Sequence, residues 1–172
     1  ICETNLVELS GVGQNFQSVQ WNSSGDGIFE NPTQLNTTYT PGTLDIAEQE
    51  VNICLNATGT ALCGNTSSCI NITIINAPDV FAGNDGTAPV DIPYVTQGAT
   101  VADYESVMWT TSGSGTFNNP ELIVTSYTPN LDDLDLGVVT LTLTAESETP
   151  CQVYNTDAVD LTINSGCSNA TA

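Results

Sequence analysis

The stretch SVQWNSSGDGIFENP at residues 18–32 returns at residues 106–120 as SVMWTTSGSGTFNNP. Around this pair, residues 18–63 align without a gap on residues 106–151 at an offset of 88, with 18 identities in 46 positions. Agreement over that length predicts that the chain contains two copies of one domain.

The repeat also predicts the domain boundaries within the 172 residues. We expect the first domain at residues 1–76 and the second at residues 77–164, with a tail or the start of a further repeat at residues 165–172. The chain opens Ile1-Cys2 without a signal peptide, and we interpret it as a mature or internal segment of a longer protein.

Each copy alternates apolar and polar residues with a period of two, as in Val139, Leu141 and Leu143 against Thr140 and Thr142. Alternation bounded by Gly, Pro and Asn is typical of half-buried antiparallel strands. Turn residues recur every 8–12 positions, which gives about seven strands in each copy. The predicted fold class is therefore all-β: two tandem immunoglobulin-like antiparallel β-sandwich domains, with short helical turns at residues 44–49 and 131–136.

The composition excludes most functions. The chain has no Lys, Arg or His against 20 Asp plus Glu, a formal net charge of -20. Nucleic acids and anionic membranes need cationic partners, so we expect neither as a binding partner and no membrane insertion. Catalysis by a triad or a catalytic Lys is excluded, and no sequence feature marks the buried acid that carboxylate catalysis needs. We therefore expect no enzyme.

Each copy has one tryptophan, Trp21 and Trp109, on its best strand. A ring packed between the two sheets is the favoured interpretation, and Tyr39 and Tyr127 are also assigned to the structure. An exposed ring that stacks on sugars is the alternative.

The combined pattern W-x-[ST]-S-G-x-G-x-F-x-N-P, then Y-T-P, then V-x-[IL]-x-L-x-A, resembles the PKD-like or Ig-like tandem repeat of large Bacteroidota cell-surface adhesins. This group includes gliding-motility adhesins exported by type IX secretion. Ile1-Cys2-Glu3 and residues 82–85 match two parts of a segment that opens such repeats. Copy two departs from the pattern, with Val90 where the family has Cys.

The resemblance implies an extracellular segment at the cell surface, acting in cell adhesion as the stalk or fibre of an adhesin or filament. A glycan- or calcium-dependent binding module of the same surface protein is the alternative. Expected partners are neighbouring repeats or subunits of the same fibre, and surface polysaccharide is a further candidate. Copy one lacks a segment equivalent to residues 77–88, so subunits joined by strand addition at an open edge are one hypothesis.

Six cysteines allow 15 disulfide connectivities. The resemblance pairs Cys2 with Cys63, the family's recurring pair. Cys54 and Cys69 flank the loop at residues 59–68 and are assigned to a cross-link across that hairpin. Cys151 lacks its usual family partner and is paired with Cys167. A zinc site is disfavoured because no C-x2-C spacing occurs.

No cofactor is required by this interpretation, but carboxylates without cations suit calcium, which takes 6–8 oxygen ligands. The candidate ligands are Asp79, Asn84 and Asp85 near the domain junction, and Asp132, Asp133 and Asp135 in the second copy. A solvated acidic surface is the favoured alternative.

Six N-x-[ST] sequons would make the chain a glycoprotein if they are used, although its Asn, Ser and Thr content gives roughly four by chance. They are Asn22, Asn36, Asn56, Asn65, Asn71 and Asn169.

Overall fold

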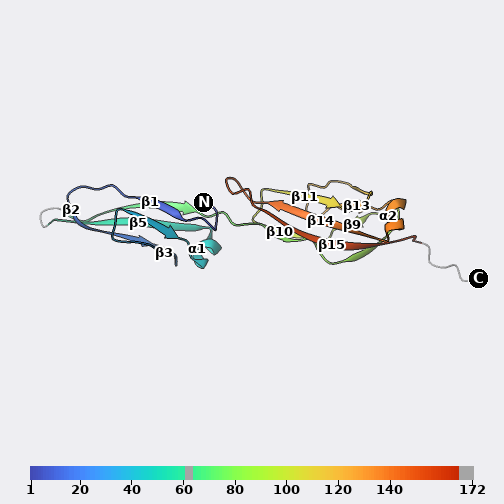
Figure 1. Cartoon of the computed structure of the whole chain (residues 1–172), viewed down its shortest axis with the longest axis horizontal. Helices are drawn as coiled ribbons and strands as arrows, with labels where there is room; N and C mark the ends of the chain where they lie inside the picture. The colour runs from blue at the N-terminus through green and yellow to red at the C-terminus, as the bar shows by residue number, and fades with distance from the viewer. Residues whose placement is uncertain (61–63, 167–172) are drawn as a thin grey trace, which may run out of the picture. The chain divides into compact units, whose positions relative to one another are not determined.

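A computed structural model describes residues 1–60 and 64–166 of the chain. It forms two compact units, Ile1–Asn76 and Ala77–Ala172, which divide at the residue where the first sequence copy ends. We describe each unit by itself, as unit 1 and unit 2 (Figure 1).

Unit 1 consists of two three-stranded sheets and one helical turn. One sheet has the strand order β1-β4-β3 and the other β2-β5-β6. The bounds are β1 Val7–Ser10, β2 Phe16–Ser23, β3 Ile28–Phe29, β4 Asn36–Thr40, α1 Thr43–Glu48, β5 Glu50–Gly59 and β6 Thr66–Thr73.

Unit 2 repeats this plan and has three further strands, β7 and β8 before it and β10 between the counterparts of β1 and β2. Its sheets have the orders β11-β14-β15-β8 and β12-β13-β9, and β7 pairs with β10. The bounds are β7 Asp79–Phe81, β8 Gly86–Pro89, β9 Tyr94–Val95, β10 Thr100–Ala102, β11 Ser106–Thr111, β12 Thr116–Phe117, β13 Ser126–Thr128, α2 Leu131–Leu136, β14 Val138–Glu146 and β15 Tyr154–Asn164.

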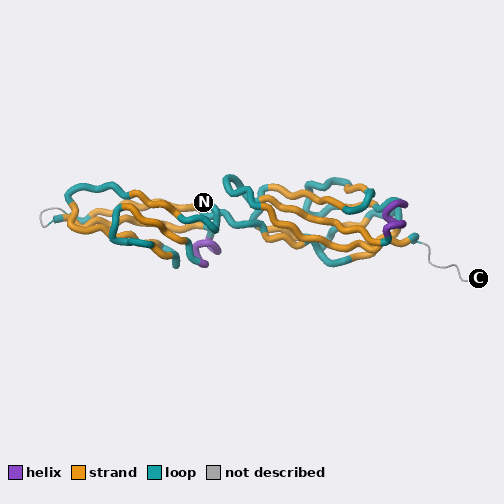
Figure 2. The backbone as a smooth tube through the Cα atoms, in the orientation of Figure 1, coloured by secondary structure: helices purple, strands orange, loops and turns teal. Residues whose placement is uncertain are grey.

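The all-β sandwich class and the two helical turns predicted from the sequence are confirmed. The helix of each unit lies at the end of its strands (Figure 2). Neither helix in the described part of the chain is long or apolar enough to cross a membrane.

One strand pair departs from the predicted antiparallel pattern. β8 runs parallel to β15, with Leu161 opposite Gly86 and Ile163 opposite Ala88. Hairpin neighbours must be antiparallel, whereas β8 and β15 are separated by most of unit 2, and this long connection allows a parallel pair.

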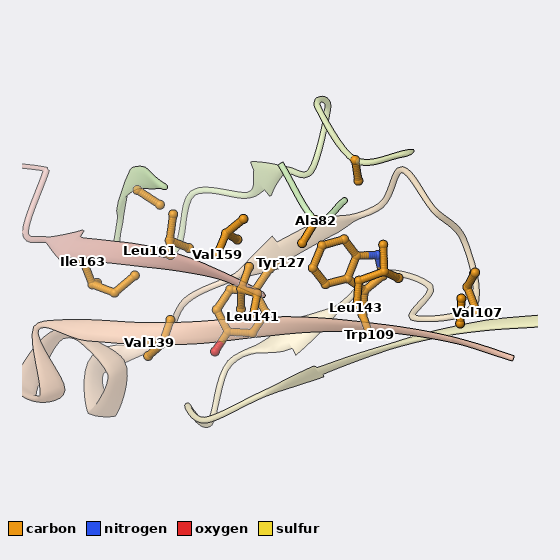
Figure 3. Packing of buried hydrophobic residues seen from close by; sticks show 13 residues of the cluster. Ala82, Val107, Trp109, Tyr127, Val139, Leu141, Leu143, Val159, Leu161 and Ile163 are labelled. Carbon is orange, nitrogen blue, oxygen red and sulfur yellow. The ribbon is translucent and has the colours of Figure 1, made fainter. Parts of the chain in front are cut away.

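Each unit has its own hydrophobic core, built from the alternating apolar positions. In unit 2, Leu141 and Leu143 are fully buried and pack in one cluster with Trp109 and Tyr127 (Figure 3). Burial of an aromatic or aliphatic side chain of this size contributes about 1.5–3 kcal/mol.

The interpretation of both tryptophans as core residues is confirmed, and the sugar-stacking alternative is wrong. Trp21 is 6% exposed and Trp109 is 2% exposed. The Trp21 indole N–H donates to the Gln34 carbonyl at 2.8 Å, so the polar atom of the ring is satisfied inside the unit.

Candidate functional site

The repeated glycine loop folds over a buried aspartate in each unit. In unit 1, Asp45 lies in the first turn of α1, and its carboxylate Oδ2 accepts a hydrogen bond from the Tyr39 hydroxyl at 2.6 Å. The backbone N–H groups of Gly27 and Gly42 donate to the same oxygen at 3.2 and 2.9 Å. We call this arrangement the carboxylate lock of unit 1.

Unit 2 contains the equivalent lock around Asp133. Its Oδ2 accepts hydrogen bonds from the Tyr127 hydroxyl at 2.7 Å, from Gly115 N–H at 3.0 Å and from Asn130 N–H at 3.2 Å. Its Oδ1 accepts from Ser114 N–H at 2.7 Å. A charge can be buried without a cation here because backbone N–H groups and a hydroxyl surround it.

The lock explains why the glycines recur. A Cβ added at Gly25 would lie 1.4 Å from Asp45 Oδ1, and one at Gly113 would lie 2.3 Å from Asp133 Oδ1. The loop can approach the carboxylate closely only without a side chain at these positions.

The two locks differ at one pair of positions. In unit 1, the Asp26 carboxylate caps α1 by accepting from Leu44 N–H at 3.0 Å, and the N-cap residue is Gly42. In unit 2, Ser114 replaces that aspartate and Asn130 caps α2, accepting from Asp133 N–H at 3.1 Å. Each unit therefore supplies one capping side chain, from the loop in one case and from the helix N-cap in the other.

The second carboxylate oxygen also differs. Asp45 Oδ1 has no hydrogen-bond partner, whereas Asp133 Oδ1 has Ser114 N–H. Unit 1 therefore buries an oxygen whose desolvation is not compensated, which makes its lock the weaker of the two.

The environment shifts the acidity of both partners in unit 2. Burial raises the pKa of the Asp133 carboxyl, but the hydrogen bonds from Ser114, Tyr127, Asn130 and Gly115 outweigh it and hold that pKa below its usual value. Burial, together with the neighbouring Asp133 carboxylate, raises the pKa of the Tyr127 hydroxyl. The lock is therefore an ionised aspartate bound to a neutral tyrosine.

No sequence feature marked a buried acid, but each unit buries one. Asp45 and Asp133 are 1% and 0% exposed. Their oxygens face the backbone of the same unit, so no substrate can reach either carboxylate. We interpret both as structural groups that fix the loop to the helix.

The predicted calcium ligands do not gather into a site. In residues 1–60 and 64–166, no group of three or more His, Cys, Asp or Glu side chains could hold a metal ion. Both oxygens of Asp133 accept hydrogen bonds from residues of its own unit, and calcium binding by this carboxylate stays a prediction. Asp132 and Asp135 are exposed on α2.

The three candidates near the start of unit 2 have separate environments. Asp79 is exposed in β7. Asp85 Oδ1 accepts from Asp160 N–H at 2.9 Å, and the Asn84 carbonyl accepts from the Tyr94 hydroxyl at 3.5 Å. Calcium binding at these residues stays a prediction.

The cysteines are found in disulfides where the structure describes them. A disulfide joins Cys54 to Cys69 across β5 and β6. Cys2 and Cys151 are also disulfide-bonded. The backbone of Cys2 forms an isolated parallel β-bridge with Ile75, which lies beyond the end of β6. The partners assigned to them, Cys63 and Cys167, lie outside the described residues, so those two pairings stay predictions.

Five of the six sequons lie in unit 1. Four of their asparagines are exposed and one, Asn56, is partly buried; the exposed four are Asn22, Asn36, Asn65 and Asn71. Asn169 lies outside the described residues. The structure leaves glycosylation sterically open at the exposed positions.

An open groove of about 710 Å³ in unit 2 was not predicted from the sequence. Exposed apolar side chains of Tyr104, Met108, Leu122 and Val124 line it. Comparison of the two copies could have revealed the groove, because Met108, Leu122 and Val124 replace the polar residues of copy one. Those residues are Gln20, Gln34 and Asn36. Copy one keeps an aromatic residue, Phe16, at the position of Tyr104, so the two units differ at the other three positions.

Comparison with known proteins bears on the fold. No family model and no curated protein matches the chain. Among solved structures, it is similar to protocadherin gamma B7 extracellular cadherin domains 1-4, with a TM-score of 0.50 and 13% identity, covering 95% of this chain and 48% of that one. The fold is an immunoglobulin-like sandwich.

Two further solved structures are similar over different lengths. The mouse clustered PcdhgC3 EC1-3 structure has a TM-score of 0.48 and 16% identity, and the match covers 95% of this chain and 64% of that one. The PKD domain from KIAA 1837 protein has a TM-score of 0.36 and 20% identity, over 53% of this chain and 92% of that one. The chain thus spans less than two thirds of the cadherin structures it matches.

Proposed function

We propose that the chain is an extracellular structural repeat segment of a cell-surface adhesin or filament, and that it acts as a stalk. The observation that carries this is the internal repeat: two sandwich units, each with its own core and its own carboxylate lock. An architecture of repeated self-contained units suits a protein that spans distance.

Further observations support a place outside the cell. Disulfides persist in oxidising compartments, and all four cysteines within residues 1–60 and 64–166 are disulfide-bonded. The net charge of -20 without any cationic side chain keeps such a segment soluble and repels nucleic acid and anionic lipid. The resemblance of the repeat to Bacteroidota adhesins of the type IX and gliding-motility kind supplies the proposed class of parent protein.

The unit 2 groove favours a second candidate function, a binding module for surface polysaccharide or another ligand. Contiguous exposed apolar side chains mark interaction sites more often than scattered ones do. Tyr104, Met108, Leu122 and Val124 form such a set, and unit 1 has polar residues at the positions of the last three.

Grafting copy-one residues into the groove separates the two functions. The variant Met108→Gln, Leu122→Gln, Val124→Asn removes the apolar lining while keeping side chains that the same fold already accepts in unit 1. The stalk function predicts that neither the native chain nor this variant binds a polysaccharide array or intact cells. Binding by the native chain that the variant loses, with an unchanged melting temperature, would replace the stalk with the binding module.

Calcium is tested by thermal unfolding in EDTA and in millimolar Ca²⁺, with ionic strength held high and constant. A stalk that needs no metal melts at the same temperature in both. A rise of many degrees that Mg²⁺ does not reproduce would instead identify a calcium-stiffened rod.

A further inference from the structure

The groove of unit 2 lies along the free edge of a β-strand. Among the described strands, β11 is the first of its sheet and pairs only with β14. The opposite wall of the groove is the segment at residues 121–124, which lies between β12 and β13 and is not a strand. A free strand edge presents backbone groups with which a further strand can pair.

The pairing register shows which backbone groups of β11 face the groove. Ser112 N–H donates to the Thr140 carbonyl at 2.9 Å, and alternate residues of an antiparallel strand turn their backbone groups to opposite sides. The odd-numbered residues of β11 therefore turn theirs away from β14, as Trp109 does when its N–H donates to the Pro120 carbonyl at 2.8 Å. Val107 lies two residues earlier at the groove, and in the described part of the chain no backbone hydrogen bond joins it to the opposite wall.

The opposite wall is fixed to the core of the unit. The Trp109 indole N–H donates to the carbonyls of Leu122 and Ile123, both at 3.1 Å, and the Thr96 hydroxyl donates to the Ile123 carbonyl at 3.2 Å. Trp109 is itself buried. A groove that is formed before binding loses little conformational freedom when a ligand enters it.

The rim of the groove is apolar and open. Met108, Leu122 and Val124 are 40%, 50% and 48% exposed. Met108 belongs to the strand edge, and the other two belong to the opposite wall. An extended segment between the two walls would cover apolar side chains on both of its sides.

Three acids border the groove, and none of them occurs in copy one. Glu105 and Glu121 line the groove, and Glu148 lines an adjoining hollow that shares Glu105 with it. Copy one has neutral residues at the three positions, namely Gln17, Thr33 and Thr60. The acidic and the apolar substitutions therefore fall at one place in one copy, as expected if both contact the same ligand.

These acids indicate the charge of the ligand. The chain has no Lys, Arg or His, so neither this protein nor a second copy of it supplies a side-chain cation to the groove. Glu105 Oε2 accepts from Thr149 N–H at 3.0 Å, which holds that carboxylate beside the groove. Complementary charges at the rim of an interface raise specificity and the association rate, so a basic partner is favoured and a second copy is disfavoured.

The groove suits a peptide better than a sugar. Among the described residues that line it, Tyr104 is the single aromatic on which a sugar ring could stack. The backbone groups of Val107 instead suit main-chain hydrogen bonds, and the exposed aliphatic rim suits the alternate side chains of an extended peptide.

We propose that the unit 2 groove binds an extended basic segment of another protein, which adds to β11 as a further strand. The segment pairs with the backbone of Val107, packs apolar side chains at alternate positions on Met108 and Leu122, and places Lys or Arg against Glu105 and Glu121. This inference deepens the second candidate function, the binding module at the groove, and rests on it.

The test uses two peptide libraries and the full chain. The first library has peptides of about seven residues, with Lys or Arg at both ends and Val, Ile, Leu, Phe or Tyr at alternate positions. The second library has Glu at both ends and is otherwise identical. By fluorescence anisotropy, we expect the best basic peptides to bind about tenfold or more tightly than their acidic twins, and to weaken as the salt concentration rises. At saturation with such a peptide, amide exchange at Val107 should slow by about tenfold or more.

Two variants with copy-one residues test the two parts of the site. The triple variant Met108→Gln, Leu122→Gln, Val124→Asn should bind the basic peptides about tenfold more weakly. The double variant Glu105→Gln, Glu121→Thr should also weaken binding and should remove most of its salt dependence. Both should keep the native melting temperature, because unit 1 accepts the same residues in the same fold.

A matched control removes two exposed acids that do not line the groove. Glu8→Gln with Asp135→Asn changes the net charge as much as the double variant does, and should leave the affinity for the basic peptides unchanged. A loss equal to that of the double variant would overturn the proposal, since net charge alone would then explain the binding.

The remaining outcomes separate this inference from the proposed functions. Equal binding of both libraries would overturn the inference, as would peptide binding that the triple variant keeps. Polysaccharide binding that the triple variant loses, without peptide binding, would overturn the inference and retain the binding module. Self-association that the triple variant loses would assign the groove to a second copy and overturn the inference. Absence of peptide, polysaccharide and cell binding would refute the inference and the binding module together and leave the stalk.

Discussion

Replacing Asp133 by Asn tests whether the carboxylate lock determines the stability of unit 2. The substitution keeps the size of the side chain and removes its charge and one acceptor oxygen. The side chain is fully buried, so water cannot supply the missing acceptor.

The size of the destabilisation follows from the four groups that donate hydrogen bonds to the Asp133 carboxylate. An amide oxygen in the Oδ2 position could keep Tyr127, Gly115 and Asn130, but its NH₂ group would then face Ser114 N–H. One buried N–H without an acceptor costs about 1–3 kcal/mol, and each remaining bond loses about 1 kcal/mol with the charge. Relief of the buried charge offsets part of this loss, which leaves a net destabilisation of about 3 kcal/mol.

Urea unfolding followed by tryptophan fluorescence measures the effect, and hydrogen exchange in β5 and β14 assigns it to a unit. Asp135→Asn is the matched control: this exposed aspartate lies on the same helix, and its replacement should change the free energy of unfolding by less than about 0.5 kcal/mol. A loss below about 1 kcal/mol for Asp133→Asn, or an effect equal to that of the control, would refute the role of the lock.

Three further predictions concern pH, the disulfide and the glycine loop. The pKa of Asp133 is lower in the folded state than in the unfolded state, so its contribution to the stability of unit 2 is complete above the unfolded pKa of about 3.9. That contribution is lost as the pH falls through the folded-state pKa. The Asp133→Asn variant should therefore lack this acid-dependent loss of stability in unit 2. Cys54→Ser with Cys69→Ser should cost about 3 kcal/mol in unit 1, since the two cysteines are 15 residues apart, and reduction should add nothing further in that unit's β5–β6 hairpin. Gly25→Ala should destabilise unit 1 by about 3 kcal/mol or more because its Cβ would collide with the buried aspartate, whereas Gly64→Ala, with open space around it, should be nearly neutral; equal melting temperatures would contradict the packing of the loop.

The sandwich and its core could be predicted from the sequence because both depend on local residue patterns. The period-two alternation sets the strand faces, and the recurrence of Trp21 as Trp109 at one offset marks an inward position. The parallel pairing of β8 could not be predicted, since it depends on which distant strand has a free edge.

The buried aspartates could not be recognised by the same means. An acid in a turn is usually solvated, and nothing in the local sequence shows that several hydrogen-bond donors converge on it. The available signal was identity across the repeat: Asp45 aligns with Asp133, while the neighbouring acids of the 132–135 cluster have no counterpart. A charge kept at one position, beside a tyrosine and two glycines also kept, indicates a hydrogen-bonded structure.

The exchange of capping residues between the two locks limits how such repeats can recombine. Consider a recombination between two copies with its breakpoint between residues 26 and 42 of copy one, which align with residues 114 and 130 of copy two. Such a breakpoint would join the loop of one lock to the helix of the other. One product would carry Asp26 against an asparagine N-cap, although a Cβ added at Gly42 would lie 2.1 Å from Asp26 Oδ1. The reciprocal product would have a serine and a glycine at these positions, and would lack both the Asp26 carboxylate and the asparagine side chain that cap the two helices. Gene shuffling among these repeats should therefore tolerate breakpoints outside the loop–helix segment and select against breakpoints within it, so that the segment is inherited as a block.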